Sequence, residues 1–218
     1  MYVAAPQSAA PALPSKHLAQ ALDLAERAIV TVVYLGLVAR LLAHGWYSGE
    51  LTSLLLLPSE GLVVVFLLFR RRTTDISLRG SEWLLALTAT LAPMLVERGT
   101  GAALVPTWLA AGLMLMGLIV QIHAKITLGR SFGCVPAHRG LQLSGPYRFV
   151  RHPMYAGYLL SHIAFLLVNP TLQNVGAYVL CYALQIPRLM AEERLLAVDC
   201  RYREYQARVK SRLIPGIF

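Results

Sequence analysis

Long apolar runs separated by short polar stretches make up most of the chain. Several of the runs have about the length that a membrane-spanning helix needs, and charged side chains within them are few. They predict an all-α, polytopic membrane protein with about five to six transmembrane helices. The expected spans are 28–43, 51–69, 83–96, 105–126, 154–168 and 172–189. Asn169 and Pro170 separate the last two runs, so these should form a tight helical hairpin.

Composition supports a location in the membrane. Of the 218 residues, 56% are hydrophobic and 14% are charged, and the mean hydropathy is +0.56, which lies outside the usual balance of a soluble domain. A net charge of +9 is also compatible with nucleic-acid binding. The basic residues, however, fall in short clusters beside apolar runs, as membrane topology signals do. We therefore expect membrane lipids as partners and no nucleic acid.

The basic clusters also predict an orientation. The loop 70–79, the stretch 125–151 and the segment from Arg188 onward are rich in Lys and Arg. The positive-inside rule places all three on the cytoplasmic side of the membrane. Counting spans back and forward from these clusters puts the N- and C-termini in the cytoplasm. We expect an integral protein of the bacterial inner membrane.

The polar residues divide the chain into three parts. Residues 1–15 are rich in Ala and Pro and lack the layout of a signal peptide, which predicts a disordered tail. Residues 16–126 should hold transmembrane helices 1–4, and residues 127–218 should form the cofactor-binding, catalytic region with the last hairpin. The three cysteines lack metal-ligand spacing, so we expect free thiols and no metal site.

Two polar segments flank the predicted hairpin. The first reads LSGPYRFVRHPMYAG (143–157) and the second reads RLMAEER (188–194). A hairpin folds its two ends back on one another, so His152 and Tyr155 should lie near Arg188 and Glu192. We therefore expect a cytoplasmic cofactor site at this end of the protein.

The residue types suit a methyl-transfer reaction. Pro153 is suited to the first turn of a helix, whose free N–H groups attract an anionic group such as an amino-acid carboxylate. Glu192 can accept hydrogen bonds from ribose hydroxyls or an ammonium, while Arg188 on the same helix face can hold an acidic acceptor. A carboxylate acceptor needs alignment and exclusion of water rather than a strong base. For a thiol, amine or hydroxyl acceptor, His152 or Glu193 is the candidate base.

Simpler interpretations compete with these roles. The arginines could be positive-inside anchors, and Tyr147 and Tyr155 could be aromatic residues at the membrane interface. Lys125, at the end of the fourth run, is expected to extend its amine toward the interface. Glu60 is either a functional carboxylate within the membrane or part of a helix start or break at residues 58–60.

The region from about residue 127 to the C-terminus resembles the isoprenylcysteine carboxyl methyltransferase family and its bacterial and phospholipid methyltransferase relatives. The resemblance rests on GPYRFVRHPMYAG (145–157), the Glu192-Glu193 pair, YREY (202–205) and RLIP (212–215). It implies a multispan helical membrane enzyme that binds S-adenosylmethionine on its cytoplasmic side. It also implies a lipid-facing tunnel for a hydrophobic or lipidated acceptor, with the carboxylate of an isoprenylcysteine-like or other lipophilic substrate as the first choice.

The resemblance implies roles for individual residues at matched positions. Arg188 corresponds to the catalytic arginine that holds the acceptor. The implied cofactor contacts are Leu141, Gln142, Tyr147, His152, Pro153, Met154, Tyr155 and Glu192. The segment 132–139 departs from the eukaryotic prenylcysteine enzymes, which leaves the identity of the acceptor open.

Three other functions stay open at this point. The acceptor could be a phospholipid amine. The chain could instead be a nicotinamide-dependent membrane reductase, since sterol reductases have a similar Arg-His-Pro-x-Tyr region, although they usually place Asn where this chain has Met154. It could also be a non-enzymatic transporter or scaffold in which Glu60, Arg40 and the Arg188–Glu192 pair line a pathway or support the fold. The sequence does not predict an oligomeric state.

Overall fold

The computed structural model describes residues 16–48, 51–97 and 102–218, and within them the chain is helical. The predicted disordered tail at 1–15 lies outside these residues. The α-helices are α1 (Lys16–Ser48), α2 (Leu51–Phe69), α3 (Gly80–Leu91), α4 (Thr107–Leu128), α5 (Pro153–Val168), α6 (Leu172–Leu196) and α7 (Cys200–Arg208). Short 3-10 turns occur at Ala92–Leu95, Gly129–Ser131 and Gly145–Arg148. The prediction of an all-α fold is therefore confirmed for the described residues.

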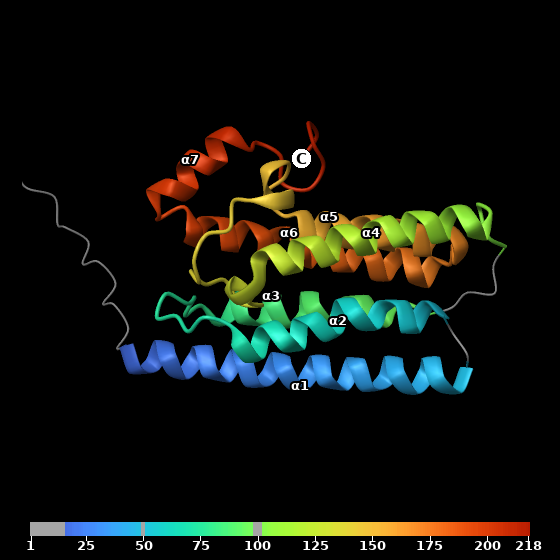
Figure 1. Cartoon of the computed structure of the whole chain (residues 1–218), viewed down its shortest axis with the longest axis horizontal. Coiled ribbons are helices and arrows are strands. Elements are labelled where there is room, and N and C mark those ends of the chain that lie inside the picture. The colour runs from blue at the N-terminus through green and yellow to red at the C-terminus, as the bar shows by residue number, and fades with distance from the viewer. Residues whose placement is uncertain (1–15, 49–50, 98–101) are drawn as a thin grey trace, which may run out of the picture.

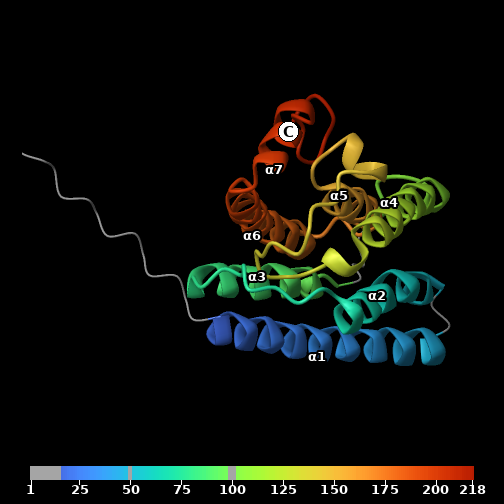
Figure 2. The same ribbon diagram turned by 60° about the vertical axis from the view of Figure 1, so that its left-hand side comes forward.

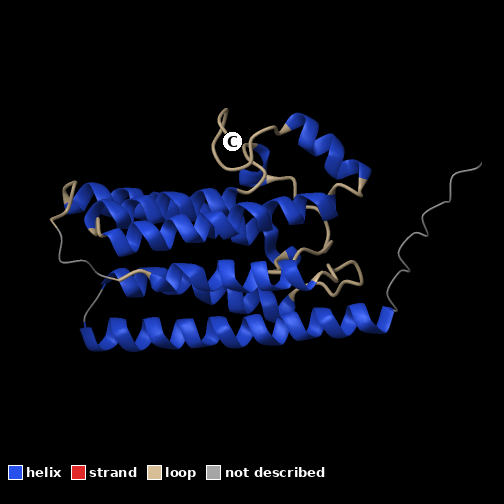
Figure 3. Cartoon of the chain, turned by 180° about the vertical axis from the view of Figure 1, so that it is seen from behind, coloured by secondary structure: helices blue, strands red, loops and turns tan. Residues whose placement is uncertain are grey.

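The long helices lie side by side in layers. Helix α1 forms one side, α2 and α3 lie next to it, and α4, α5 and α6 form the far side (Figure 1). In the turned view α1 to α3 form one group and α4 to α6 another, with α7 and the C-terminal segment above α5 and α6 (Figure 2). The two groups pack against each other, α2 against α4 and α3 against α6. Most of the loop between α4 and α5 lies at the same end of the bundle as α7 (Figure 3). The polar connections expected to carry the chemistry are therefore gathered at one end.

Several helices differ in extent or continuity from those expected. Helix α1 begins at Lys16, well before Ala28, and runs for 33 residues, or about 50 Å. Helix α2 continues through Pro58 without interruption, so of the two alternatives for Glu60 the helix start or break at residues 58–60 is wrong. Thr107–Ser131 is the helical stretch among the described residues that is long and apolar enough to cross a membrane, while Leu57–Phe69 and Pro153–Val168 are apolar but shorter. The number of spans stays a prediction.

A buried ion pair joins α2 to α4. The amine of Lys125 lies 3.0 Å from Glu60 Oε1 and donates to Ser59 Oγ at 2.7 Å. No part of the Lys125 side chain is exposed, so the prediction that its amine reaches toward the interface is wrong. An unpaired charge is costly to bury, and Glu60 supplies the counter-charge within the bundle.

Helices α4 and α5 pack with their backbones in close approach. A Cβ atom added to Gly117 would lie 2.8 Å from the carbonyl oxygen of Gly157, and one added to Gly157 would lie 2.7 Å from the carbonyl oxygen of Gly117. Small residues permit such close approach between membrane helices. Beside this contact, the amide of Gln121 donates to Ser161 Oγ at 2.9 Å. The contact holds α5, which begins directly after His152, firmly against α4.

Replacing Gly117 with alanine should destabilise the protein by about 1–3 kcal/mol, because the added methyl group has no room between the two backbones. Gly112→Ala on the same helix is the matched control, since a Cβ atom there meets no atom within 4 Å. The control should leave the unfolding temperature unchanged or raise it slightly, because alanine favours a helix over glycine. Thermal unfolding in detergent compares the two variants, and equal unfolding temperatures would contradict the packing argument.

Candidate active site

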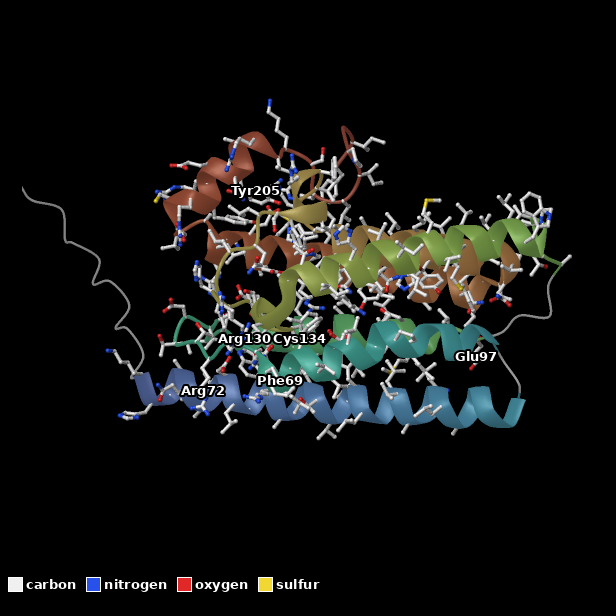
Figure 4. All side chains as sticks on the ribbon, in the orientation of Figure 1. Phe69, Arg72, Glu97, Arg130, Cys134 and Tyr205 are labelled. Atoms are coloured by element: carbon white, nitrogen blue, oxygen red, sulfur yellow. The ribbon has the colours of Figure 1, made fainter. Side chains whose placement is uncertain are left out.

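A pocket opens at the end of the bundle where the loop between α4 and α5 meets α6 and α7. Its lining includes the predicted cofactor contacts Leu141, Gln142, Tyr147, His152, Met154, Tyr155 and Glu192. Of the predicted contacts, Pro153 is not part of the lining but is buried in the first turn of α5. Figure 4 shows Tyr205, on α7, and Cys134 at this end of the bundle, with Glu97 at the other. The structure thus brings most of the predicted residues together, while their individual roles stay predictions.

Backbone hydrogen bonds hold the C-terminal segment against the start of α5. The backbone N–H of Arg151 donates to Ser211 O at 3.0 Å, and that of His152 donates to Arg212 O at 2.9 Å. The His152 ring is also fixed, since its Nε2 lies 3.0 Å from Glu193 Oε1. These contacts give the start of the RLIP ending (212–215) a structural use, because it holds the backbone of Arg151 and His152, which line the pocket.

Glu193 is the centre of a buried charge cluster. Its Oε2 lies 3.1 Å from Arg151 Nη1 and 3.1 Å from Arg212 Nε, and its Oε1 faces His152. Burial raises the pKa of Glu193, but the His152 hydrogen bond and the charges of Arg151 and Arg212 outweigh burial and lower the pKa below its usual value. Both carboxylate oxygens are engaged, so Glu193 is poorly placed to act as a base.

Glu192 differs from its neighbour in environment. It is half-buried, lines the pocket, and its carboxylate has no hydrogen-bond or ion-pair partner among the residues that the structure covers. Burial and the charge of Glu192 raise the pKa of Tyr147 well above the ordinary value, so the tyrosine hydroxyl stays protonated. The carbonyl of Tyr147 accepts a 2.6 Å hydrogen bond from the hydroxyl of Tyr205, which ties α7 to the pocket.

Arg188 lies next to the pocket rather than in its lining. Its side chain is buried, and its guanidinium lies 5.7 Å from the centroid of the Tyr155 ring. Nε donates to the carbonyl of Cys134 at 3.1 Å, and Nη2 lies 3.3 Å from the Cys134 sulfur. Nη1 also donates to Thr90 Oγ1 and Gln185 Oε1, and within the described ranges no carboxylate pairs with this arginine. The guanidinium is therefore a buried cation that has hydrogen bonds to neutral groups but no carboxylate within ion-pair distance among these residues.

Some residues of the pocket had no predicted role. Arg151, Tyr202 and Tyr205 line it, as do Gly133 and Arg139 of the loop between α4 and α5. The three-residue spacing of the two tyrosines could have indicated a shared helix face on α7. The sequence holds no comparable signal for the loop residues, because their placement depends on contacts with distant helices.

The lowered pKa of Glu193 makes its stabilising effect dependent on pH. Because the folded-state pKa lies below the unfolded value of about 4.3, the stabilisation is complete above that pH and is lost as the pH falls through the folded value. Glu193→Gln should therefore cost about 3 kcal/mol at pH 7 and progressively less below about pH 4. Unfolding temperatures measured from pH 7 to pH 3 test this, with the exposed Glu204→Gln as control. A difference that is the same at both ends of the range would contradict the assignment.

The comparisons with known proteins point to one family. Residues 110–198 match the family model of the isoprenylcysteine carboxyl methyltransferase (ICMT) family. This part, which is less than half of the chain, is similar to the ICMT family. The match begins in α4, includes the loop that lines the pocket, and extends through α5 and α6. It confirms the family predicted from the sequence motifs, and with it the prediction of an integral membrane methyltransferase.

The other comparisons add less. The comparison with curated proteins gave no match. Among solved structures, the chain is similar to the eukaryotic intramembrane Ras methyltransferase ICMT, with 19% sequence identity and a TM-score of 0.48. That similarity covers 83% of this chain and 74% of the solved one.

Proposed function

We propose that this ICMT-family protein transfers a methyl group from S-adenosylmethionine to the carboxylate of an isoprenylcysteine-like or other lipophilic acceptor. The buried guanidinium of Arg188 carries the proposal. It has no carboxylate partner in the part of the chain that is described, and it lies against Tyr155 in the wall of the pocket. Burying a cation without a direct ion-pair partner is costly, so this position suits an anionic ligand.

The pocket offers groups that fit S-adenosylmethionine. Glu192 presents a carboxylate without a protein partner, which suits ribose hydroxyls or the ammonium of the amino-acid part. Arg151 also lines the pocket, and its buried Nε has no hydrogen-bond partner among the described residues. Tyr155 adds an aromatic surface on which a cationic sulfur can rest. When bound, S-adenosylmethionine supplies a methyl group attached to a positively charged sulfur.

A carboxylate acceptor needs little acid–base chemistry from the chain. The carboxylate is ionised near neutral pH, so no proton has to be removed before it attacks. The reaction forms a carbon–oxygen bond and leaves the electrons of the broken carbon–sulfur bond on sulfur. Arg188 would align the carboxylate, and the surrounding apolar helices would exclude water. The engagement of both Glu193 oxygens supports a carboxylate over an amine or thiol, because those acceptors require a base.

An apolar groove between α3 and α6 supports a lipophilic acceptor. It is lined by leucines of both helices, including Leu84, Leu91, Leu180 and Leu184, and measures about 590 Å³. Small-molecule sites commonly measure roughly 300–1,000 Å³. Leu184 lies one helical turn before Arg188, so an apolar tail in the groove could place a carboxylate at the guanidinium.

We also propose an orientation of the protein in the membrane. The loop after α2, the loop that precedes α5 and the segment after α6 carry basic residues, and all three reach the pocket end of the bundle (Figure 4). The positive-inside rule then favours a pocket that faces the cytoplasm, with both termini on that side. We retain the bacterial inner membrane as the expected location.

The proposed cofactor site can be tested by calorimetric titration of the detergent-purified protein with S-adenosylhomocysteine. The wild-type chain should bind it and should not bind reduced nicotinamide adenine dinucleotide phosphate. Glu192→Ala should lower the affinity at least tenfold, because a charge-assisted contact is lost. Binding of the nicotinamide alone would favour a reductase, and binding of neither would favour a transporter or scaffold. The exposed Glu204→Ala is the control and should bind like wild type.

The proposed role of Arg188 predicts a loss in turnover rather than in cofactor binding. Arg188→Ala should lower kcat/KM by a little over 100-fold, or about 3 kcal/mol, because it removes an oriented charge at the acceptor. Its affinity for S-adenosylhomocysteine should change far less. Arg194→Ala, at an exposed position of the same helix, should retain wild-type turnover with a farnesylcysteine analogue. Unchanged turnover in Arg188→Ala would leave Arg188 with a topological role only.

A further inference from the structure

We propose that Glu26, on α1, is a positioning residue for Arg188 that acts through the backbone of Cys134 and Val135. The inference rests on the proposed function, because it assigns a task to a residue that supports the acceptor arginine. Helix α1 lies outside the part of the chain that matches the ICMT family. The inference thus extends the working site to a helix on the far side of the bundle (Figure 2).

The first step is the contact of Glu26 with the pocket loop. The residue is 1% exposed, and its Oε1 accepts hydrogen bonds from the backbone N–H groups of Cys134 at 2.7 Å and Val135 at 2.9 Å. Hydrogen bonds from N–H groups to a carboxylate are roughly twice as strong as neutral ones. One carboxylate oxygen therefore fixes two consecutive peptide groups of a loop that has no regular secondary structure at this point.

The second step is the contact of that loop with Arg188. The carbonyl of Cys134 accepts from Arg188 Nε at 3.1 Å, and the Cys134 sulfur lies 3.3 Å from Arg188 Nη2. Thr90 Oγ1 touches both partners, at 3.1 Å from the sulfur and 3.4 Å from Arg188 Nη1. Cys134 thus holds the guanidinium at two of its three nitrogens. A shift of Cys134 would move the charge that aligns the acceptor, and small misplacements of such groups are costly to catalysis.

Glu26 also takes part in ion pairs, and their contribution to stability has to be distinguished from its hydrogen bonds to the loop. The other oxygen of Glu26 pairs with Arg70 Nη1 at 2.8 Å and also with Arg139. Asp23 pairs with the same two arginines, at 2.9 Å from each, but it has no hydrogen bond to Cys134 or Val135. Asp23 is therefore a matched control for the loss of one negative charge from the cluster.

The experiment compares Glu26→Met with Glu26→Gln and Asp23→Asn. Methionine and glutamine are similar in size and uncharged, but only glutamine has an oxygen that can accept the two N–H groups. Glu26→Met should lower kcat at least tenfold, with S-adenosylhomocysteine affinity within about threefold of wild type. Glu26→Gln and Asp23→Asn should keep kcat within about threefold. Equal losses in all three variants would assign the effect to the charge cluster and overturn the proposal, as would loss of ligand binding in Glu26→Met.

A double-mutant cycle tests the route through Arg188. Residues that act through one another give effects that do not add, whereas independent residues give additive effects. In the Arg188→Ala background, Glu26→Met should therefore lower kcat no further. A second tenfold loss would show that Glu26 acts independently of Arg188, and would overturn the proposal.

A third readout does not depend on turnover. Cys134 and Cys181 are buried and Cys200 is exposed, so maleimide labelling of a Cys200→Ser chain reports on the buried thiols. Glu26→Met should speed the labelling of Cys134, identified by peptide mass, while Asp23→Asn should not. If the wild-type protein methylates no acceptor, the proposed function fails, and this labelling still decides whether Glu26 holds the loop. Unchanged labelling would overturn the proposal.

Discussion

The cost of burying a charge without a partner governs the arrangement of this protein. Lys125 and Glu60 satisfy one another between α2 and α4, and Glu193 gathers its cationic partners where the C-terminal segment meets α5. A third cluster joins the carboxylates of α1 to Arg70 and Arg139. Each cluster links segments that are far apart in the sequence, so charge pairing helps to determine how the apolar helices fit together.

Arg188 differs from these paired charges, because it is buried without an ion pair among the described residues. Its hydrogen bonds go to neutral groups, and no carboxylate pairs with it in the described parts of the chain. It lies beside the pocket, whose wall it touches through Tyr155, and one helical turn after Leu184 of the apolar groove. A buried cation without a direct ion-pair partner at this position is suited to a ligand with an apolar tail and an anionic head.

Much of the candidate site could be predicted from short-range patterns. The apolar runs of 154–168 and 172–189, with Asn169 and Pro170 between them, indicated a hairpin whose ends meet. That reasoning placed Tyr155 near Arg188, as observed. The same reasoning gave a wrong prediction for Lys125, because a lysine near the end of a membrane helix usually extends its amine toward water. The partner that keeps Lys125 buried is on another helix, and its distance cannot be read from sequence spacing.

The sequence by itself determined the helical class, the membrane location and the family, because these follow from the length of apolar runs and from a contiguous motif. Only the tertiary structure decided which charges are paired and how the pocket loop is held. Glu26 and Cys134 are 108 positions apart in the sequence, yet one hydrogen bond joins them. Hydrogen bonds and ion pairs depend on distances of about 3 Å in space. Such distances arise only when α1, the loop and α6 pack together.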